Sequence, residues 1–198
     1  MEQTGPVIPD LLYRSLNEWR TRLFYLQLIG VNEQGIGFGN LSIRLPGSRQ
    51  FFITGTATGK FEKAGKQHYT MVKDYSFSGN SVTCTGPLRA SSESLSHAAI
   101  YESDRHTQTV IHIHHRKMWE DGKNLFPVTD PSCGFGTPDM AFEIGKQLRD
   151  GSTRKGGVLI MGGHPEGILF FGQGPEEAGK KVLSLLESIS PTENSRDR

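Results

Sequence analysis

One six-residue run, Val110-Ile-His-Ile-His-His115, limits most strongly how this chain can fold. Side chains two residues apart in a β-strand project to the same face of a sheet. We therefore expect His112 and His114 to point together, while Ile111 and Ile113 point to the opposite face. Two imidazoles on one rigid strand form a preformed bidentate site for a metal ion. The competing interpretation is an ordinary strand that carries surface histidines.

A third imidazole would hold a divalent ion and leave one coordination position open, which is typical of catalytic zinc. His164 is the best candidate, because it follows an apolar strand in the turn Met-Gly-Gly-His-Pro-Glu-Gly, where glycines allow a close approach. Zinc is the expected ion, although imidazole sites also accept Mn²⁺, Co²⁺ or Fe²⁺. His115 should face away and serve a structural or supporting role. Three other histidines lack such pairing: His68 and His106 are expected at the surface, and His97 in a helix where it orients a neighbour.

Short strands alternate irregularly with amphipathic helices along the rest of the chain. Leucines and Trp19 recur at three- and four-residue steps over Pro9–Ile29, which predicts an N-terminal helix. Further helices are predicted at Ser92–Ser103, Pro138–Leu148 and Pro175–Ile189. Strands are predicted at Leu41–Leu45, Gln50–Thr54, Tyr75–Ser78, Ser81–Thr85, Thr109–His114, Gly157–Met161 and Gly167–Phe171. This order predicts a layered α/β protein with a mixed or largely antiparallel sheet.

Size and composition favour one domain. A chain of 198 residues with 35% hydrophobic content can bury one substantial core, so we expect a single domain over residues 1–189 and a flexible polar tail over 190–198. The net charge of +1 gives no broad field for nucleic acid or an anionic membrane. No run approaches the ~18 apolar residues of a membrane span, and Met1–Asp10 lacks signal-peptide order. With two isolated cysteines, Cys84 and Cys133, these features predict a cytoplasmic protein.

Three segments offer groups that bind anions or sugar oxygens. Gly37–Ser42 presents backbone N–H groups and the Asn40 amide, Thr54–Lys60 presents three hydroxyls and an ammonium, and Ala90–Glu93 opens a helix with two serines. Taken alone, each segment is more often a Gly-rich turn or a capped helix than an anion site. Glu93 likewise suits a helix N-terminus without catalysis. Beside a metal, its carboxylate could take a proton from a carbon or hydroxyl whose neighbouring oxygens the ion polarises.

These segments, in this order, resemble the class II aldolase/adducin family from about Leu12 to Leu186. The resemblance rests on GFGNLSIR at 37–44, FITGTATGK at 52–60, ASSESLSHAAIY at 90–101, VIHIHH at 110–115, GFGTPDMA at 134–141 and GGHPEG at 162–167. Six ordered motifs are far more specific than one.

The resemblance implies a three-layer α/β/α fold with a central, mainly antiparallel sheet, assembled as a homotetramer with active sites between subunits. It assigns a zinc ion to His112, His114 and His164, and acid/base chemistry to Glu93. Phosphate binding carries over to Asn40, Thr56, Ser91 and Ser92. A glutamate at position 93 favours an aldolase-type lyase, which cleaves a small ketose or hydroxycarbonyl compound through a metal-stabilised enediolate. The alternatives are an epimerase or dehydratase of the same family, or a non-catalytic adducin-like assembly module.

The sequence departs from the family pattern in four places. About 20 residues, His115 to Cys133, replace the usual helix-loop-strand excursion, which a segment of this length is too short to contain. No tyrosine follows Pro175, although several relatives use one. The threonine loop is two residues longer than usual, so Thr56, Thr58 and Gly59 all remain candidates for phosphate contacts. The third histidine lies in HPEG rather than HG, which would alter the geometry around Pro165.

Overall fold

The structure, a computed structural model, describes residues 6–149 and 151–189. A seven-stranded antiparallel sheet runs through the described part of the chain in the order β6-β5-β4-β3-β7-β9-β8. The strands are β3 (Asn40–Arg44), β4 (Phe51–Thr54), β5 (Tyr69–Ser76), β6 (Ser81–Thr85), β7 (Thr109–His114), β8 (Val158–Ile160) and β9 (Gly167–Gly172). A separate short hairpin, β1 (Gly30–Val31) with β2 (Gly37–Phe38), leads into β3.

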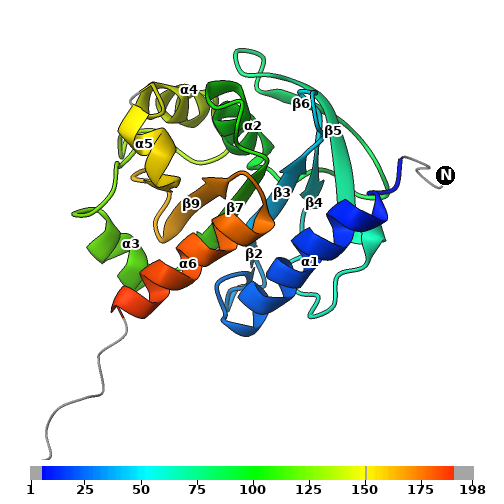
Figure 1. The fold of residues 1–198 in the computed structure, drawn as a ribbon, viewed down its shortest axis with the longest axis horizontal. Coiled ribbons are helices and arrows are strands. Elements are labelled where there is room, and N and C mark those ends of the chain that lie inside the picture. The colour runs from blue at the N-terminus through cyan, green and yellow to red at the C-terminus, as the bar shows by residue number, and fades with distance from the viewer. Residues whose placement is uncertain (1–5, 150, 190–198) are drawn as a thin grey trace, which may run out of the picture.

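Helices cover both faces of this sheet, as Figure 1 shows. One layer contains α1 (Asp10–Tyr25), α3 (Arg116–Gly122) and α6 (Pro175–Ile189), and the other contains α2 (Ser94–Ser103), α4 (Pro138–Gln147) and α5 (Gly151–Gly156). Each layer has its own apolar core against the sheet. The predicted three-layer α/β/α fold with an antiparallel sheet is confirmed. That residues 1–189 form a single domain stays a prediction, and the tail at 190–198 lies outside the described residues.

Strand β7 lies inside the sheet, between β3 and β9, and its side chains alternate as the sequence predicts. Ile111 and Ile113 belong to the core under α1 and α6, whereas Val110 belongs to the core under α2 and α4. His112 and His114 therefore share the α2 face. Cα pairing places Asn40 of β3 opposite His112, and Gly167 of β9 opposite His114. The ladder thus brings together residues far apart in the sequence.

Two element boundaries differ from the prediction by more than two residues. The first helix ends at Tyr25 rather than Ile29, because Gln27 adopts φ +58° and a Schellman-type pair of bonds closes the helix: Gln27 N–H to Phe24 O at 2.9 Å and Leu28 N–H to Leu23 O at 3.0 Å. Leu26 is accordingly 39% exposed and lies outside the apolar face.

Strand β5 begins at Tyr69, six residues before the predicted start. Its first four residues are all buried, and a β-bulge interrupts the pairing between Val72 and Asp74. Both features hide the period of two on which the prediction relied. The short elements β1, β2, α3, α5 and a 3₁₀ turn at Lys66–His68 were not predicted. No helix in the described ranges is long and apolar enough to span a bilayer.

The contact between α1 and α6 yields a stability prediction. A Cβ at Gly179 would lie 2.2 Å from the Trp19 ring, so Gly179→Ala should separate the two helices and lower the free energy of unfolding by about 1–3 kcal/mol. Gly145→Ala in α4 is the control, because its Cβ would meet nothing closer than 3.7 Å and alanine favours helix by about 0.5–1 kcal/mol. Urea denaturation measures both. Equal stabilities would contradict the packing described.

Candidate active site and metal centre

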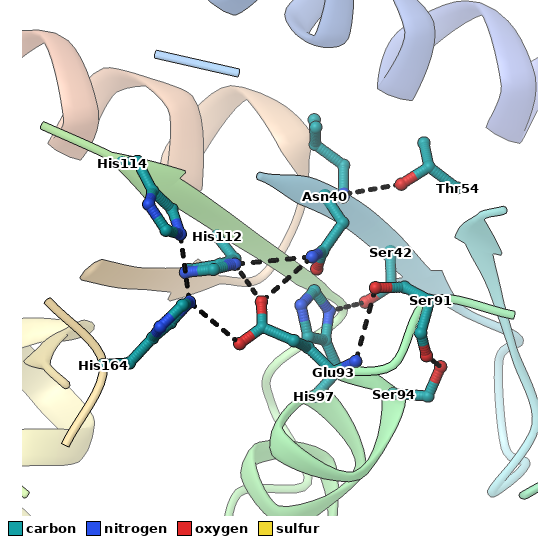
Figure 2. Close-up of polar contacts among 11 residues, drawn as sticks. Asn40, Ser42, Thr54, Ser91, Glu93, Ser94, His97, His112, His114 and His164 are labelled. Carbon is teal, nitrogen blue, oxygen red and sulfur yellow. Dashed lines mark hydrogen bonds and ion pairs between the residues drawn. The ribbon is translucent and has the colours of Figure 1, made fainter. Parts of the chain in front are cut away.

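Three histidines converge at one end of β7. His112 and His114 project from the strand, and His164 comes from the turn between β8 and β9. One ring nitrogen of each lies within 4.8 Å of those of the other two, and the Nε2 atoms of His114 and His164 are 3.0 Å apart. His112 Nε2 is buried and has no hydrogen-bond partner. Figure 2 shows the three rings turned toward one another.

The donor set fits a divalent metal ion. Burial, together with the neighbouring histidines, lowers the pKa of His114 to about 3 and that of His164 to about 4. Both rings are therefore neutral near pH 7, which is the form that binds a metal. The unpartnered His112 Nε2 would gain a ligand bond in place of the hydrogen bond it lacks. Three imidazoles in one cluster are typical of a catalytic zinc site with an open position.

Glu93 places a carboxylate against the same cluster. It precedes the first turn of α2 and is only 4% exposed. One oxygen contacts His112 Nδ1 and accepts a 3.1 Å hydrogen bond from the Asn40 amide, and the other lies 3.4 Å from His164 Nε2. The side chain makes no capping bond to α2. Its position is therefore explained by the histidines and not by helix capping.

The charge state of Glu93 follows from these contacts. Burial alone would raise the pKa of the Glu93 carboxyl. The His112 and His164 rings and the Asn40 amide together outweigh this effect and hold the pKa well below its usual range. Glu93 is therefore a carboxylate at neutral pH. A buried carboxylate without such partners would be strongly disfavoured.

Beneath Glu93, His97 fixes α2 to the sheet. His97 Nδ1 lies 2.7 Å from the Ser42 hydroxyl, which lies 2.6 Å from the Tyr101 hydroxyl. Burial lowers the pKa of His97 to about 3, so the ring is neutral. His97 is thus a helix residue that orients Ser42, in line with the expectation that it orients a neighbour. Because it lies one turn after Glu93, the contact also restrains the helix end that carries the carboxylate (Figure 2).

The site opens into a cavity of about 470 Å³. All of the site residues predicted from the sequence line it: Asn40, Thr56, Ser91, Ser92, Glu93, His112, His114 and His164. The structure therefore brings the whole predicted set together around one space. Their individual roles stay predictions.

The threonine loop borders the cavity, which Thr56, Thr58 and Gly59 all line. Thr54 accepts a hydrogen bond from Leu41 N–H at 3.2 Å, and the Thr58 hydroxyl donates to Gly55 O at 2.8 Å, so both serve the fold. Thr56 is exposed at the cavity. Arg20 of α1 is buried despite its charge, and its guanidinium donates to Thr58 O at 3.1 Å. This contact ties the loop to the helix.

The structure also shows the surroundings of the remaining histidines and the fold of the short middle region. His115 Nδ1 accepts a hydrogen bond from Met118 N–H at 3.1 Å and caps α3, while the residue also lines the cavity, so a purely structural role stays a prediction. His106 is exposed as predicted, but His68 is half-buried, because its ring stacks on Phe61 and accepts from Gly65 N–H. Residues 115–133 hold only the short helix α3 and a loop.

Sequence reasoning missed several residues at the cavity. Phe135 packs on His164 with ring centroids 4.3 Å apart, and Phe38 lies 5.4 Å from His114. Glu166 adds a second carboxylate residue to the lining. The motifs GFGT and HPEG contained Phe135 and Glu166, but only the folded chain shows that they face the same space.

A family model matches the part of the chain that contains most of the site. Residues 30–119 match the family model described as Class II Aldolase and Adducin N-terminal domain. Over these 90 of its 198 residues, the chain is similar to the class II aldolase/adducin family. The matched segment contains every predicted site residue except His164. No curated protein sequence matches the chain.

Solved structures extend this fold over most of the chain. L-fuculose-1-phosphate aldolase from Thermus thermophilus is 19% identical, with a TM-score of 0.66 over 91% of this chain and 92% of that chain. YgbL from Klebsiella pneumoniae, described as a putative aldolase/epimerase/decarboxylase, is 16% identical, with a TM-score of 0.68 over 94% and 93%. These likenesses establish a shared fold that includes the region around His164.

The close packing of the triad predicts a sensitive glycine. A Cβ at Gly167 would lie 2.6 Å from His164 Cδ2 and 3.1 Å from His112 Nε2, so Gly167→Ala should push the rings apart. We expect metal affinity to fall about tenfold or more, since overpacking of this kind typically costs 1–3 kcal/mol. Gly174→Ala is the control, because its Cβ would meet nothing within 4 Å. Competition with a chromogenic chelator measures both affinities. Unchanged affinity in Gly167→Ala would mean that the histidines do not bind as one cluster.

Proposed function

We propose that this protein is a metal-dependent lyase of aldolase type, which cleaves a small ketose or hydroxycarbonyl compound. The observation that carries the proposal is the buried, ionised Glu93 carboxylate, which contacts His112 and His164 of the three-histidine cluster at one cavity. This arrangement places a proton-transfer group beside a metal site, inside a space that a small substrate can enter. The match of residues 30–119 to the class II aldolase/adducin family supports the same chemistry.

His112, His114 and His164 would hold the ion, and zinc fits three imidazoles best. When bound, a divalent ion supplies Lewis-acid stabilisation for negative charge on adjacent substrate oxygens. Mn²⁺, Co²⁺ or Fe²⁺ also suit this donor set. The chain contributes a fixed, largely buried cluster in which the neutral His114 and His164 rings are ready to bind.

Glu93 would move the proton that this chemistry requires. When the C–C bond of a β-hydroxycarbonyl compound breaks, the hydroxyl loses a proton and a carbon of the other fragment gains one. Glu93 is ionised and close to the triad, so it can accept the first proton and return one to carbon. Asn40 holds the carboxylate by its amide, which fixes the direction from which the proton is delivered. The buried Asn40 Oδ1 atom has no hydrogen-bond partner.

Asn40, Thr56, Ser91 and Ser92 would hold a phosphate or a hydroxylated end of the substrate. The Ser91 Oγ accepts from Glu93 N–H at 3.3 Å, which leaves its own proton free to donate, and Thr56 and Ser92 are exposed. In the described part of the chain, no lysine or arginine lines the cavity. Recognition of an anion here would depend on neutral N–H and O–H donors. The expected homotetramer, with active sites near subunit interfaces, and the cytoplasmic location both stay predictions.

Substitution of the carboxylate tests the proposal. Glu93→Gln should keep the metal but lower turnover by about 10²–10⁴-fold, since the amide cannot carry the proton. The assay is release of aldehyde from ketose 1-phosphates and their unphosphorylated counterparts by metal-loaded protein. Glu120→Gln on the exposed face of α3 is the control and should match wild type.

Three results would count against parts of this account. Retained turnover in Glu93→Gln would remove Glu93 from its role. Epimerised or dehydrated product without aldehyde would replace the lyase by an epimerase or dehydratase. Absence of any turnover by metal-loaded wild type would favour the assembly module.

A further inference from the structure

Glu166 is a feature of the cavity that the proposed reaction does not use. It lies in the turn His164-Pro-Glu-Gly167, two residues after the third histidine, and it lines the same cavity. Its backbone adopts φ +69°, the left-handed region that favours glycine. The backbone of a glutamate at such a position is strained relative to that of a glycine, so we ask whether the Glu166 side chain has a structural or a functional role.

The fold itself does not require a glutamate there. The backbone carbonyl of Glu166 accepts a 3.0 Å hydrogen bond from His115 N–H, which any residue could provide. The carboxylate pairs with Arg116 Nε at 3.2 Å, but the Arg116 side chain is 74% exposed, and exposed pairs of this kind contribute little to stability. Strained residues that persist without a structural reason cluster at functional sites.

Glu166 lies at the histidine end of the site. Figure 2 shows His114 and His164 on one side of Glu93 and Ser91 on the other. Glu166 follows His164 by two residues, and its partner Arg116 follows His114 by two. The charged pair therefore belongs to the histidine end, whereas the neutral donors Ser91 and Ser92 belong to the opposite end. A substrate that spans the cavity would present different groups to the two ends.

We propose that Glu166, held by Arg116, is a specificity-determining residue that accepts hydrogen bonds from hydroxyl groups on the substrate segment farthest from Ser91 and Ser92. This inference rests on the proposed function, because it assumes a ketose bound with its other end at the serines. An ionised carboxylate only accepts hydrogen bonds, so it selects hydroxyls over alkyl groups and repels a distal carboxylate or phosphate. A deoxy substrate would leave the carboxylate unpaired, which is the stronger source of discrimination.

The test compares two aldehydes. Cleavage of a ketose 1-phosphate between C3 and C4 yields dihydroxyacetone phosphate and an aldehyde, so the reverse addition can be measured with either glyceraldehyde or propanal. Wild type should prefer glyceraldehyde by kcat/KM, and Glu166→Gly and Glu166→Ala should reduce this preference by about tenfold or more. Glu120→Gln is the matched control, because Glu120 also faces Arg116, at 3.9 Å, but does not line the cavity.

Two further readouts separate this inference from a structural role and from the proposed function. Glu166→Gly should keep or raise Tm, because glycine relieves the positive φ, whereas a structural glutamate would lower Tm when removed. Calorimetric affinities for a ketohexose 1-phosphate and its 5,6-dideoxy analogue need no turnover. If wild type binds the hydroxylated ligand more tightly and Glu166→Gly loses this preference, the inference is supported, whether or not wild type cleaves the ligand. Absence of cleavage by wild type would refute only the proposed function. An equal ligand ratio in wild type and Glu166→Gly, or a lowered Tm, would overturn the inference.

Discussion

Backbone hydrogen bonding between β3, β7 and β9 is the constraint on which the site depends. The antiparallel register places Asn40 opposite His112 and Gly167 opposite His114. A slip of one residue would turn His112 and His114 toward the apolar core and expose Ile111 and Ile113. The burial of those isoleucines under α1 and α6 therefore fixes the register, and the register in turn positions the histidines.

Burial of polar side chains on the histidine face of β7 costs desolvation free energy, and the contacts around them offset part of that cost. Glu93 pairs with His112, the Asn40 amide holds Glu93, and the Ser42 hydroxyl pairs with His97. His112 Nε2 still has no partner. Buried polar atoms of this kind are rare and call for a ligand or a functional reason. A metal ion held by His112, His114 and His164 would give the His112 Nε2 atom the partner that it lacks.

Most of the site could be predicted from the sequence, because the signals for it lie in short runs of consecutive residues. The period of two on β7 placed His112 and His114 on one face, and the motif order placed Glu93 and Ser91 near them. What it missed depends on tertiary contacts. Burial of Arg20 follows from carbonyls of a distant loop, and the early end of α1 follows from a left-handed Gln27. Glu166 could be found only when its turn was placed at the cavity, since nothing in HPEG alone gives its orientation.

The central claim is that three histidines form one metal centre, and elemental analysis tests it most directly. Purified, untagged protein dialysed against Zn²⁺ and then against metal-free buffer should retain one ion per chain. The His112→Ala variant, shown by circular dichroism to be folded, should retain far less. A variant that keeps its full complement, or a wild-type protein that retains no ion, would contradict the account.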